Sequence, residues 1–303
     1  MPATGENKSK TWAEVSIKHP SELTEAVSNF FFEKGAQAVV HEDSSGLVLS
    51  KAGFGSSGPS AGLKDEINAF LKDLADIFGL TSLLKAEWSS VSYGDWAEKW
   101  KQDLDPIEVG STLVIKPTWR EYQAGPDRVV LSLDPGLAFG TGHHASTFLC
   151  LEGVEEYLSQ PGHADARVLD VGTGSGILSM AAAALGRGRI VALDIDPDTL
   201  PVAAGNFSLN NQADRVFLLC ADPAAISGRF DLILANLHRD ALIRLASTLV
   251  NLGAPGARWI LSGMLDEQAE EVAERFISVG LSLTHRAVKG EWVALIMEKR
   301  EEP

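Results

Sequence analysis

The most constraining feature of this sequence is a glycine-rich turn within residues 168–177, which read VLDVGTGSGI. A short apolar run leads through Gly172, Gly174 and Gly176 into an apolar stretch with helical spacing. Glycines let the backbone approach a ligand closely, and the amino end of the following helix favours negative charge. The pattern therefore predicts a strand, a tight turn and a helix that bind a nucleotide-like cofactor.

Two classes of cofactor compete for this turn. A dinucleotide fingerprint places glycines at the first, third and sixth positions, but here the sixth position is Ile177 and the third glycine, Gly176, stands at the fifth. This spacing resembles the turn that binds S-adenosylmethionine. Asp194 lies 22 residues beyond Gly172, at the end of the next apolar run. A carboxylate at this position can accept hydrogen bonds from both hydroxyls of an adenosine ribose, whether the cofactor is a dinucleotide or S-adenosylmethionine.

After residue 129 the sequence alternates short β-rich runs with apolar stretches at helical spacing. The predicted strands are residues 167–171, 189–194, 216–220, 230–235 and 258–262, and the predicted helices include residues 177–185, 198–209 and 239–252. This alternation predicts an α/β fold with helices on both faces of a parallel sheet. Two last strands, residues 281–288 and 291–298, are joined by a link too short for a parallel crossover. An antiparallel hairpin therefore completes a seven-stranded mixed sheet.

The first 92 residues predict a separate, smaller domain. Their pattern reads strand, helix, strand, strand, helix, strand, with the two middle strands at residues 38–41 and 46–49. This order is typical of a ferredoxin-like α+β domain. Residues 93–125, which mix tryptophans with charges and prolines, are interpreted as a connector, and residues 126–303 as the α/β domain.

Composition excludes some classes of function. A net charge of −15 argues against direct binding of nucleic acid, because lysine and arginine must replace the counterions of a phosphate backbone, whereas a basic protein is an acceptable partner. No apolar run approaches the roughly 20 residues that span a bilayer. We therefore expect a cytoplasmic protein that is not bound to a membrane. We also expect it to be a monomer. Cys150 and Cys220 lie in apolar segments and are predicted to be buried thiols.

Polar residues stand where the predicted strands of the α/β domain end. Asn236 follows the fourth strand, where methyltransferases that act on amino groups often place Asn or Asp to hold the attacking nitrogen. Leu237 and His238 stand where base-flipping adenine methyltransferases have two prolines, which argues against a nucleic-acid substrate. Asp196 is predicted to cap the next helix, and Asp222 either to cap a helix or to contact adenine.

A second glycine-rich stretch, residues 134–147, reads DPGLAFGTGHHAST and is typical of a loop that reaches over a site. With it, the segments that carry a family resemblance are the turn at residues 168–178, Ala235-Asn236-Leu237, and Asp95-Trp96 with Trp100-Lys101. Together they resemble the ribosomal protein L11 methyltransferase family. The resemblance extends over nearly the whole chain.

The resemblance implies a small N-terminal domain that recognises the substrate protein, a connector, and a class I (Rossmann-like) methyltransferase domain. It implies S-adenosylmethionine as the cofactor, with lysine side chains and the N-terminal amine of ribosomal protein L11 as the groups that are methylated. Carried over to this sequence, the cofactor contacts fall on Thr147, Gly172, Asp194 and Asn236, with Gly174 in the same turn.

The glycine-rich loop departs from the family at three positions. The family usually reads Gly-Thr-Gly-Thr-His-Pro-Thr-Thr, whereas this chain has His143, Ala145 and Ser146, and keeps His144 and Thr147. The departure bears on loop rigidity and substrate choice rather than on the cofactor. Adjacent histidine side chains diverge and no cluster with ligand spacing lies nearby, so no metal is expected.

Methyl transfer from a sulfonium requires an aligned, neutral amine rather than a nucleophilic residue, so no catalytic residue is assigned. We hypothesise that Asn236 and nearby carbonyls orient the amine. Three alternatives stay open: a methyltransferase for another protein or a small amine, an oxidoreductase that uses a nicotinamide dinucleotide, and a cofactor-binding protein without activity.

Overall fold

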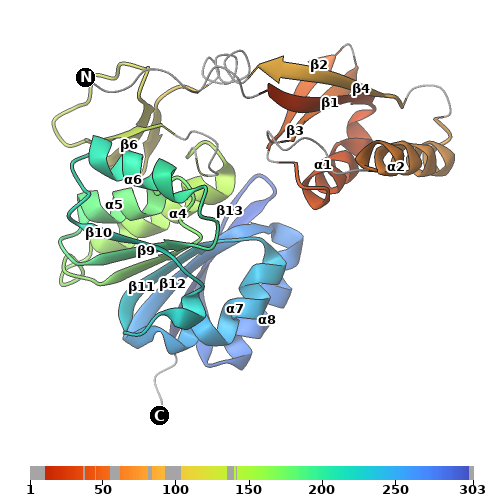
Figure 1. Cartoon of the computed structure of the whole chain (residues 1–303). Coiled ribbons are helices and arrows are strands. Elements are labelled where there is room, and N and C mark those ends of the chain that lie inside the picture. The colour runs from red at the N-terminus through yellow and green to blue at the C-terminus, as the bar shows by residue number, and fades with distance from the viewer. Residues whose placement is uncertain are drawn as a thin grey trace. The chain divides into compact units, whose positions relative to one another are not determined.

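The chain folds into two compact units, Met1–Asp103 and Leu104–Pro303 (Figure 1). The structure is a computed structural model that describes residues 11–36, 38–44, 46–54, 62–80, 84–92, 104–134, 140 and 142–299. The described strands of the two units belong to separate sheets, and their buried residues form separate hydrophobic core clusters.

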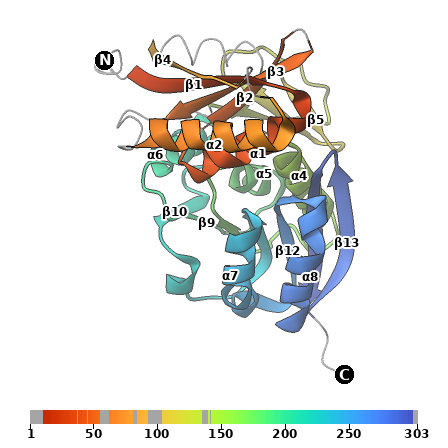
Figure 2. The ribbon, with the colours of Figure 1, turned by 90° about the vertical axis from the view of Figure 1, so that its right-hand side faces the viewer.

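The described part of the N-terminal unit is a four-stranded antiparallel sheet with the helices α1 and α2 on one face (Figure 2). Its elements are β1 (Thr11–His19), the 3-10 helix η1 (Ser21–Leu23), α1 (Thr24–Glu33), β2 (Ala38–Ser44), β3 (Leu47–Phe54), α2 (Leu63–Phe78) and β4 (Ala86–Ser92). The strands lie in the order β2-β3-β1-β4. This topology confirms the predicted ferredoxin-like domain.

Periodicity explains why these residues form these elements. In β1, Val15 and Ile17 are fully buried and lie two residues apart, the spacing of one face of a strand. The buried residues of α2 recur every three or four positions, at Leu63, Ile67, Leu71 and Leu74. The two patterns meet in one core between the sheet and the helices.

The second unit contains a seven-stranded mixed sheet in the order β10-β9-β8-β11-β12-β14-β13. Its strands are β8 (Val168–Val171), β9 (Ile190–Asp194), β10 (Val216–Cys220), β11 (Phe230–Asn236), β12 (Gly253–Leu265), β13 (Leu281–Lys289) and β14 (Trp292–Lys299). The first five strands of that order are parallel, and β14 runs antiparallel to both of its neighbours. The predicted parallel sheet with a closing antiparallel hairpin is thus confirmed.

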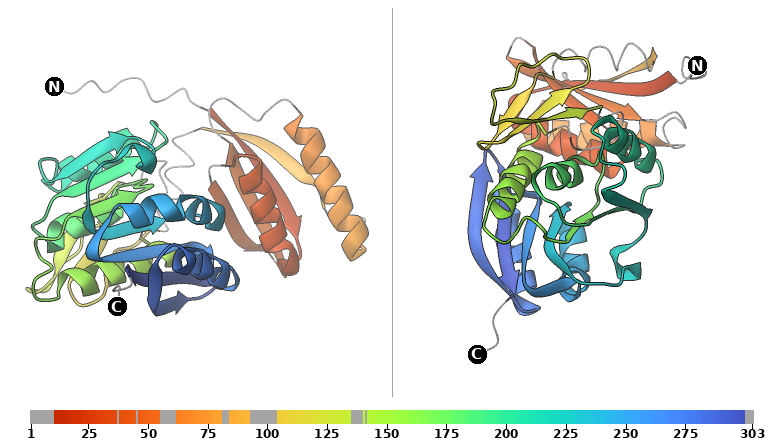
Figure 3. Two further views of the ribbon diagram at one scale, coloured as in Figure 1. Left: turned by 90° about the horizontal axis from the view of Figure 1, so that it is seen from below. Right: turned by 90° about the vertical axis from the view of Figure 1, so that its left-hand side faces the viewer.

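Helices cover both faces of this sheet. They are α4 (Ala145–Leu158), α5 (Ile177–Leu185), α6 (Leu200–Leu209), α7 (Arg239–Asn251) and α8 (Ala269–Ser278), with the 3-10 helices η2 (Pro223–Ala225) and η3 (Asp266–Gln268). Residues of α4, α5 and α6 share one core cluster, and residues of α7 and α8 share the other. Seen from below, α7 and α8 lie in front of the sheet, in blue (Figure 3, left).

One helix start differs from its prediction. The helix α6 begins at Leu200, after an N-cap at Thr199, so Asp196 is not its cap. The Asp196 carboxylate instead accepts a hydrogen bond from the backbone N–H of Asp198 at 2.9 Å. Proline lies in the first turn of α6, where its missing N–H has no helical partner to lose.

The prediction of two buried thiols is wrong for one cysteine. Cys150 is fully buried in α4, but Cys220 is exposed. Cys220 lies on β10, the edge strand of the sheet, where only Val216 of the five residues is buried. An apolar run predicts a strand, but its burial depends on whether a neighbour covers it.

Residues 104–125 belong to the second unit, whereas the sequence predicted a connector over 93–125. They contribute β5 (Ile107–Val109) and β6 (Leu113–Pro117), which form a three-stranded sheet with β7 (Val129–Leu133). The strands β6 and β7 pair in parallel. Residues 93–103, with Trp96 and Trp100, lie outside the described residues.

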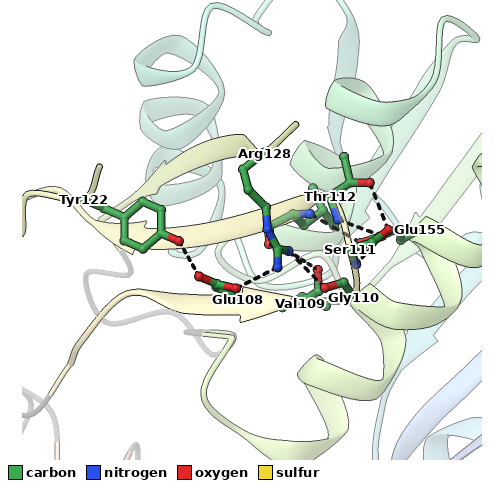
Figure 4. Close-up of polar contacts among 9 residues, drawn as sticks. Glu108, Val109, Gly110, Ser111, Thr112, Tyr122, Arg128 and Glu155 are labelled. Carbon is green, nitrogen blue, oxygen red and sulfur yellow. Dashed lines mark hydrogen bonds and ion pairs between the residues drawn. The ribbon is translucent and has the colours of Figure 1, made fainter. Parts of the chain in front are cut away.

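The hairpin turn between β5 and β6 is bound to α4 by Glu155 (Figure 4). Its carboxylate accepts hydrogen bonds from the backbone N–H groups of Ser111 at 2.8 Å and Thr112 at 2.9 Å, and from the Ser111 hydroxyl at 2.9 Å. Burial alone would raise the pKa of Glu155, but the hydrogen bonds from this turn outweigh it and lower that pKa. The three-stranded sheet is therefore fixed to the helix whose first turn carries Thr147.

Candidate functional site

The carboxyl ends of three parallel strands meet at one edge of the large sheet. Val171 at the end of β8 is aligned with Leu193 of β9 on one side and with Ala235 of β11 on the other. The residues that follow these strand ends therefore lie at the same edge, which is where open α/β sheets bind their ligands. The predicted site residues at Gly172, Asp194 and Asn236 are brought together there.

The turn after β8 has a backbone that favours glycine at three positions. The φ angles of Gly172, Gly174 and Gly176 are +72°, +53° and +84°, a region that other residues enter only with strain. The N–H groups of Gly172 and Thr173 both donate to the carbonyl of Leu193, at 2.8 and 3.0 Å. The turn is thereby held against the end of β9.

Asp194 joins the turn to the end of β9. One carboxylate oxygen accepts from the N–H of Gly174 at 3.0 Å, and the other accepts from the N–H of Asp196 at 3.1 Å. A carboxylate oxygen can accept two hydrogen bonds, so these contacts leave acceptor capacity on both oxygens of Asp194. The side chain is ready to accept two further donors side by side.

Asn236 and Thr147 contact each other across the site. The side-chain amide of Asn236 donates to the Thr147 hydroxyl at 3.1 Å. Thr147 lies in the first turn of α4 and is 1% exposed. The Asn236 Oδ1 atom is buried and accepts no hydrogen bond from any described residue. The site thus contains a buried amide oxygen that Thr147 holds in orientation and that no described residue pairs.

Asp170 is a candidate site residue that the sequence analysis missed. It is 1% exposed, in the middle of an apolar strand, and one of its oxygens accepts from the hydroxyls of Thr173 and Ser179, both at 2.7 Å. Burial raises its pKa, and its other oxygen has no hydrogen-bond partner among the described residues. The sequence offered one signal for Asp170, which is a carboxylate within a run of apolar residues. Burial of a carboxylate costs free energy, so its presence there indicates a specific role.

The second glycine-rich stretch lies against the first. Residues 135–139 and 141 of this loop lie outside the described residues. The Ser175 hydroxyl donates to the carbonyl of Gly140 at 2.6 Å. A Cβ atom on Gly142 would lie 2.9 Å from Ile107 Cδ1, so the stretch also packs closely on β5.

Asp222, at the end of β10, caps η2. Its carboxylate accepts from the N–H of Ala224 at 2.8 Å. This confirms the capping alternative of its prediction, while a contact with adenine stays a prediction.

His144 caps the amino end of α4. Its Nδ1 accepts from the N–H of Ser146 at 3.4 Å and lies 2.7 Å from the Ser146 hydroxyl, and its ring meets Trp292 edge-on, 4.3 Å between centroids. Within the part of the chain that the structure describes, no group of three or more metal-ligating side chains lies together.

Acidification is expected to weaken this cap. Burial lowers the pKa of His144 below its ordinary value of 6.5, so protons bind the unfolded chain more readily. The cap's contribution, about 1 kcal/mol, is then present above pH 6.5 and is lost as the pH falls through the lowered pKa. Urea unfolding of the wild type and of His144→Asn, which caps without titrating, at about pH 7.5 and about pH 5.5 measures this. An equal pH dependence for the two proteins would contradict the prediction.

The chain matches a known protein family over nearly its whole length. A sequence model of the family described as "Ribosomal protein L11 methyltransferase (PrmA)" matches residues 11–300. The chain belongs to the ribosomal protein L11 methyltransferase family.

Individual members of the L11 methyltransferase family resemble the chain over almost its full length. The "Ribosomal protein L11 methyltransferase" of Geotalea uraniireducens (strain Rf4) is 39% identical, over 94% of this chain and 96% of that protein. The protein of the same name from Pelobacter propionicus is 37% identical, over 95% of this chain and 97% of that protein. The crystal structure of a ribosomal protein L11 methylase from Lactobacillus delbrueckii subsp. bulgaricus, 31% identical, has a TM-score of 0.60 and covers 65% of this chain and 100% of its own.

The departure of this chain from the usual L11 methyltransferase loop has a structural context. Ala145 is the first residue of α4, directly after the cap at His144. The usual family residue there is proline, which is favoured at the first position of a helix because its φ angle is fixed. Alanine fits the same backbone with more freedom.

Among the described helices, none combines the length and the apolar character needed to cross a membrane.

Proposed function

We propose that this chain transfers methyl groups from S-adenosylmethionine to amino groups of ribosomal protein L11, on lysine side chains and on the N-terminal amine. The observation that carries the proposal is the buried Oδ1 of Asn236, which lacks a partner among the described residues while Thr147 holds the same amide. Such an acceptor costs roughly 1–3 kcal/mol, and an incoming amine N–H recovers it. The family relationship supports L11 as the protein that supplies the amine.

The residues at the sheet edge fit S-adenosylmethionine. Asp194 keeps acceptor capacity on both oxygens, which suits the two hydroxyls of a ribose. Gly174, whose N–H donates to Asp194, leaves the backbone at that contact without a side chain. Ile177, which stands where a dinucleotide turn needs its third glycine, is 2% exposed and forms part of the core. These features favour the adenosylmethionine cofactor over a nicotinamide dinucleotide.

When bound, the cofactor supplies a methyl group on a positively charged sulfur. The task of this chain is to present a neutral amine in line with that group. A free lysine has a pKa of ~10.4, so its deprotonation at pH 7 costs about 4.6 kcal/mol. Partial burial beside Asn236 lowers the pKa of the amine. Asn236 Oδ1 accepts one N–H of the substrate amine, which directs the lone pair of the amine nitrogen away from this oxygen. Water takes the released proton.

Recognition of the substrate is assigned to the N-terminal unit. A ferredoxin-like domain that is compact by itself supports a separate recognition role. The net charge of −15 suits a basic protein substrate and disfavours a nucleic acid. We further propose that the protein acts as a monomer in the cytoplasm.

Intact-mass analysis of L11 tests the proposed function. L11 is purified from cells with and without this protein, and we expect it to be heavier by whole methyl groups when the protein is present. Incubation of a lysate from the deficient cells with the enzyme and labelled cofactor is expected to label one small basic protein. An unchanged mass would contradict the assignment of L11 as the substrate. Several labelled proteins would indicate a wider set of substrates.

A further inference from the structure

One buried side chain of α6 contacts both glycine-rich segments of the site. Asn206 is 1% exposed. Its Oδ1 accepts from the backbone N–H of Asp134 at 2.8 Å, and its Nδ2 donates to the carbonyl of Asp134 at 3.0 Å and to the carbonyl of Ser175 at 2.9 Å. Asp134 is the first residue of the stretch 134–147, and Ser175 lies in the turn after β8.

The chemistry of an amide matches this place. Asp134 presents one donor and one acceptor from its backbone, as the edge of a strand does, and Ser175 presents a second acceptor. An asparagine side chain is short, and it offers an acceptor and two N–H donors together. Both Nδ2 protons are used within the protein. The Asn206 side chain therefore binds backbone groups of Asp134 and Ser175 and has no N–H left to donate to a ligand.

Neighbouring contacts show that α6 supports the turn closely. A Cβ atom on Gly176 would lie 2.6 Å from the ring of Phe207, the residue after Asn206. The Ser175 hydroxyl forms the second connection between the two segments, through its bond to the carbonyl of Gly140. The bonds of Ser175 to Asn206 and to Gly140 are buried and those of Asn206 to Asp134 are partly buried, so water competes little for them.

We propose that Asn206 is a positioning residue that fixes the turn at residues 172–176 relative to Asp134 and thereby sets the affinity for the cofactor. The inference rests on the proposed function, because it takes this turn and the two residues joined to it, Asp134 and Gly140, as walls of the adenosylmethionine site. A site whose walls are already fixed does not have to be ordered when the cofactor binds, so a wall that is free to move lowers the affinity.

The chain offers a matched control in Asn210, one helical turn further along. Asn210 accepts from the N–H of Ser132 at 2.9 Å and donates to the carbonyl of Ser132 at 2.7 Å. Its remaining bonds go to the carbonyl of Asn206 and to the sulfur of Met180. It pairs with β7 as Asn206 pairs with Asp134, but none of these hydrogen bonds reaches a glycine-rich segment.

The test compares Asn206→Ala with Asn210→Ala in the full chain. Isothermal titration with S-adenosylmethionine gives Kd, thermal unfolding gives Tm, and L11 methylation gives kcat and the KM for the cofactor. We expect both variants to lower Tm, since each loses buried hydrogen bonds. Only Asn206→Ala should raise Kd and KM, by roughly tenfold or more, with kcat at saturating cofactor within about threefold. Asn206→Asp should bind more weakly still, because it sets carboxylate oxygen against two carbonyls.

Equal changes of Kd in the two alanine variants, or an unchanged Kd in folded Asn206→Ala, would overturn the inference. If Asn206→Ala does not fold, Asn206→Asp takes its place, since it keeps the acceptor for the N–H of Asp134 and replaces only the donor to the two carbonyls. An unchanged Kd in folded Asn206→Asp would then overturn the inference. A wild-type protein that does not bind the cofactor would overturn the proposed function itself, whereas tight wild-type binding with unaffected variants overturns only the role of Asn206.

Discussion

Replacement of Asn236 with alanine is expected to lower the rate of methyl transfer to L11 by about a hundredfold, the usual cost when a reacting group loses its alignment. The variant loses the buried Oδ1 that accepts no hydrogen bond from the described residues, and with it the acceptor proposed for the amine. Steady-state methylation of L11 measures the rate. Titration with S-adenosylmethionine should give a Kd within about fivefold of the wild type, or about 1 kcal/mol.

A double-mutant cycle with Thr147 sharpens this prediction. Thr147→Val removes the hydroxyl that holds the Asn236 amide at 3.1 Å, so the amide turns more freely and part of the rate is lost. In the Asn236→Ala background the same substitution should cost little more, because the two side chains act as one unit. If Asn236→Ala lost cofactor affinity by the same factor as it lost rate, Asn236 would contact the cofactor and not the amine.

The second large effect is expected for Asp194→Asn, which should weaken S-adenosylmethionine binding roughly a hundredfold, or about 2–3 kcal/mol. The substitution is nearly isosteric, yet both carboxylate oxygens accept backbone N–H groups, from Gly174 and from Asp196. An amide puts its NH₂ against one of these two donors and also loses an acceptor for the ribose. Isothermal titration and thermal unfolding together separate lost affinity from lost stability.

Asp196→Asn provides the control for charge. Asp196 lies two residues from Asp194, and its side chain accepts from the N–H of Asp198, a bond that an amide oxygen can also accept. It removes the same charge from the same loop. If Asp196→Asn weakened the cofactor as much as Asp194→Asn, the effect would be electrostatic in general and Asp194 would lose its specific role.

Features that depend on local pattern could be predicted from the sequence. The helix α5 spans residues 177–185 and β10 spans residues 216–220, as predicted, because each is an apolar run with clear limits. The ends of the parallel strands could be predicted in the same way. Gly172, Asp194 and Asn236 followed from where those runs stop, since parallel strands end at a common edge.

Features that depend on distant partners could not be predicted. Thr147 and Asn236 form their hydrogen bond across 89 residues of sequence, and only the family resemblance pointed to both. The strands β5 and β6 were interpreted as part of a connector because the partner of β6, the parallel strand β7, lies across a loop and beyond the predicted end of that connector. Asn206 carries no sequence signal, because an asparagine in a helix is ordinary until its partners are known.

The exposure of Cys220 gives the protein a built-in place for a reporter group. The sequence has two cysteines, and burial raises the pKa of Cys150 to about 12, which keeps that thiol inert towards alkylating reagents. Cys220 is exposed and is the neighbour of Asp194 across the sheet. A maleimide dye would therefore attach at one position, one strand away from the proposed ribose contact. Its fluorescence offers a way to follow cofactor binding without introducing any substitution into the chain.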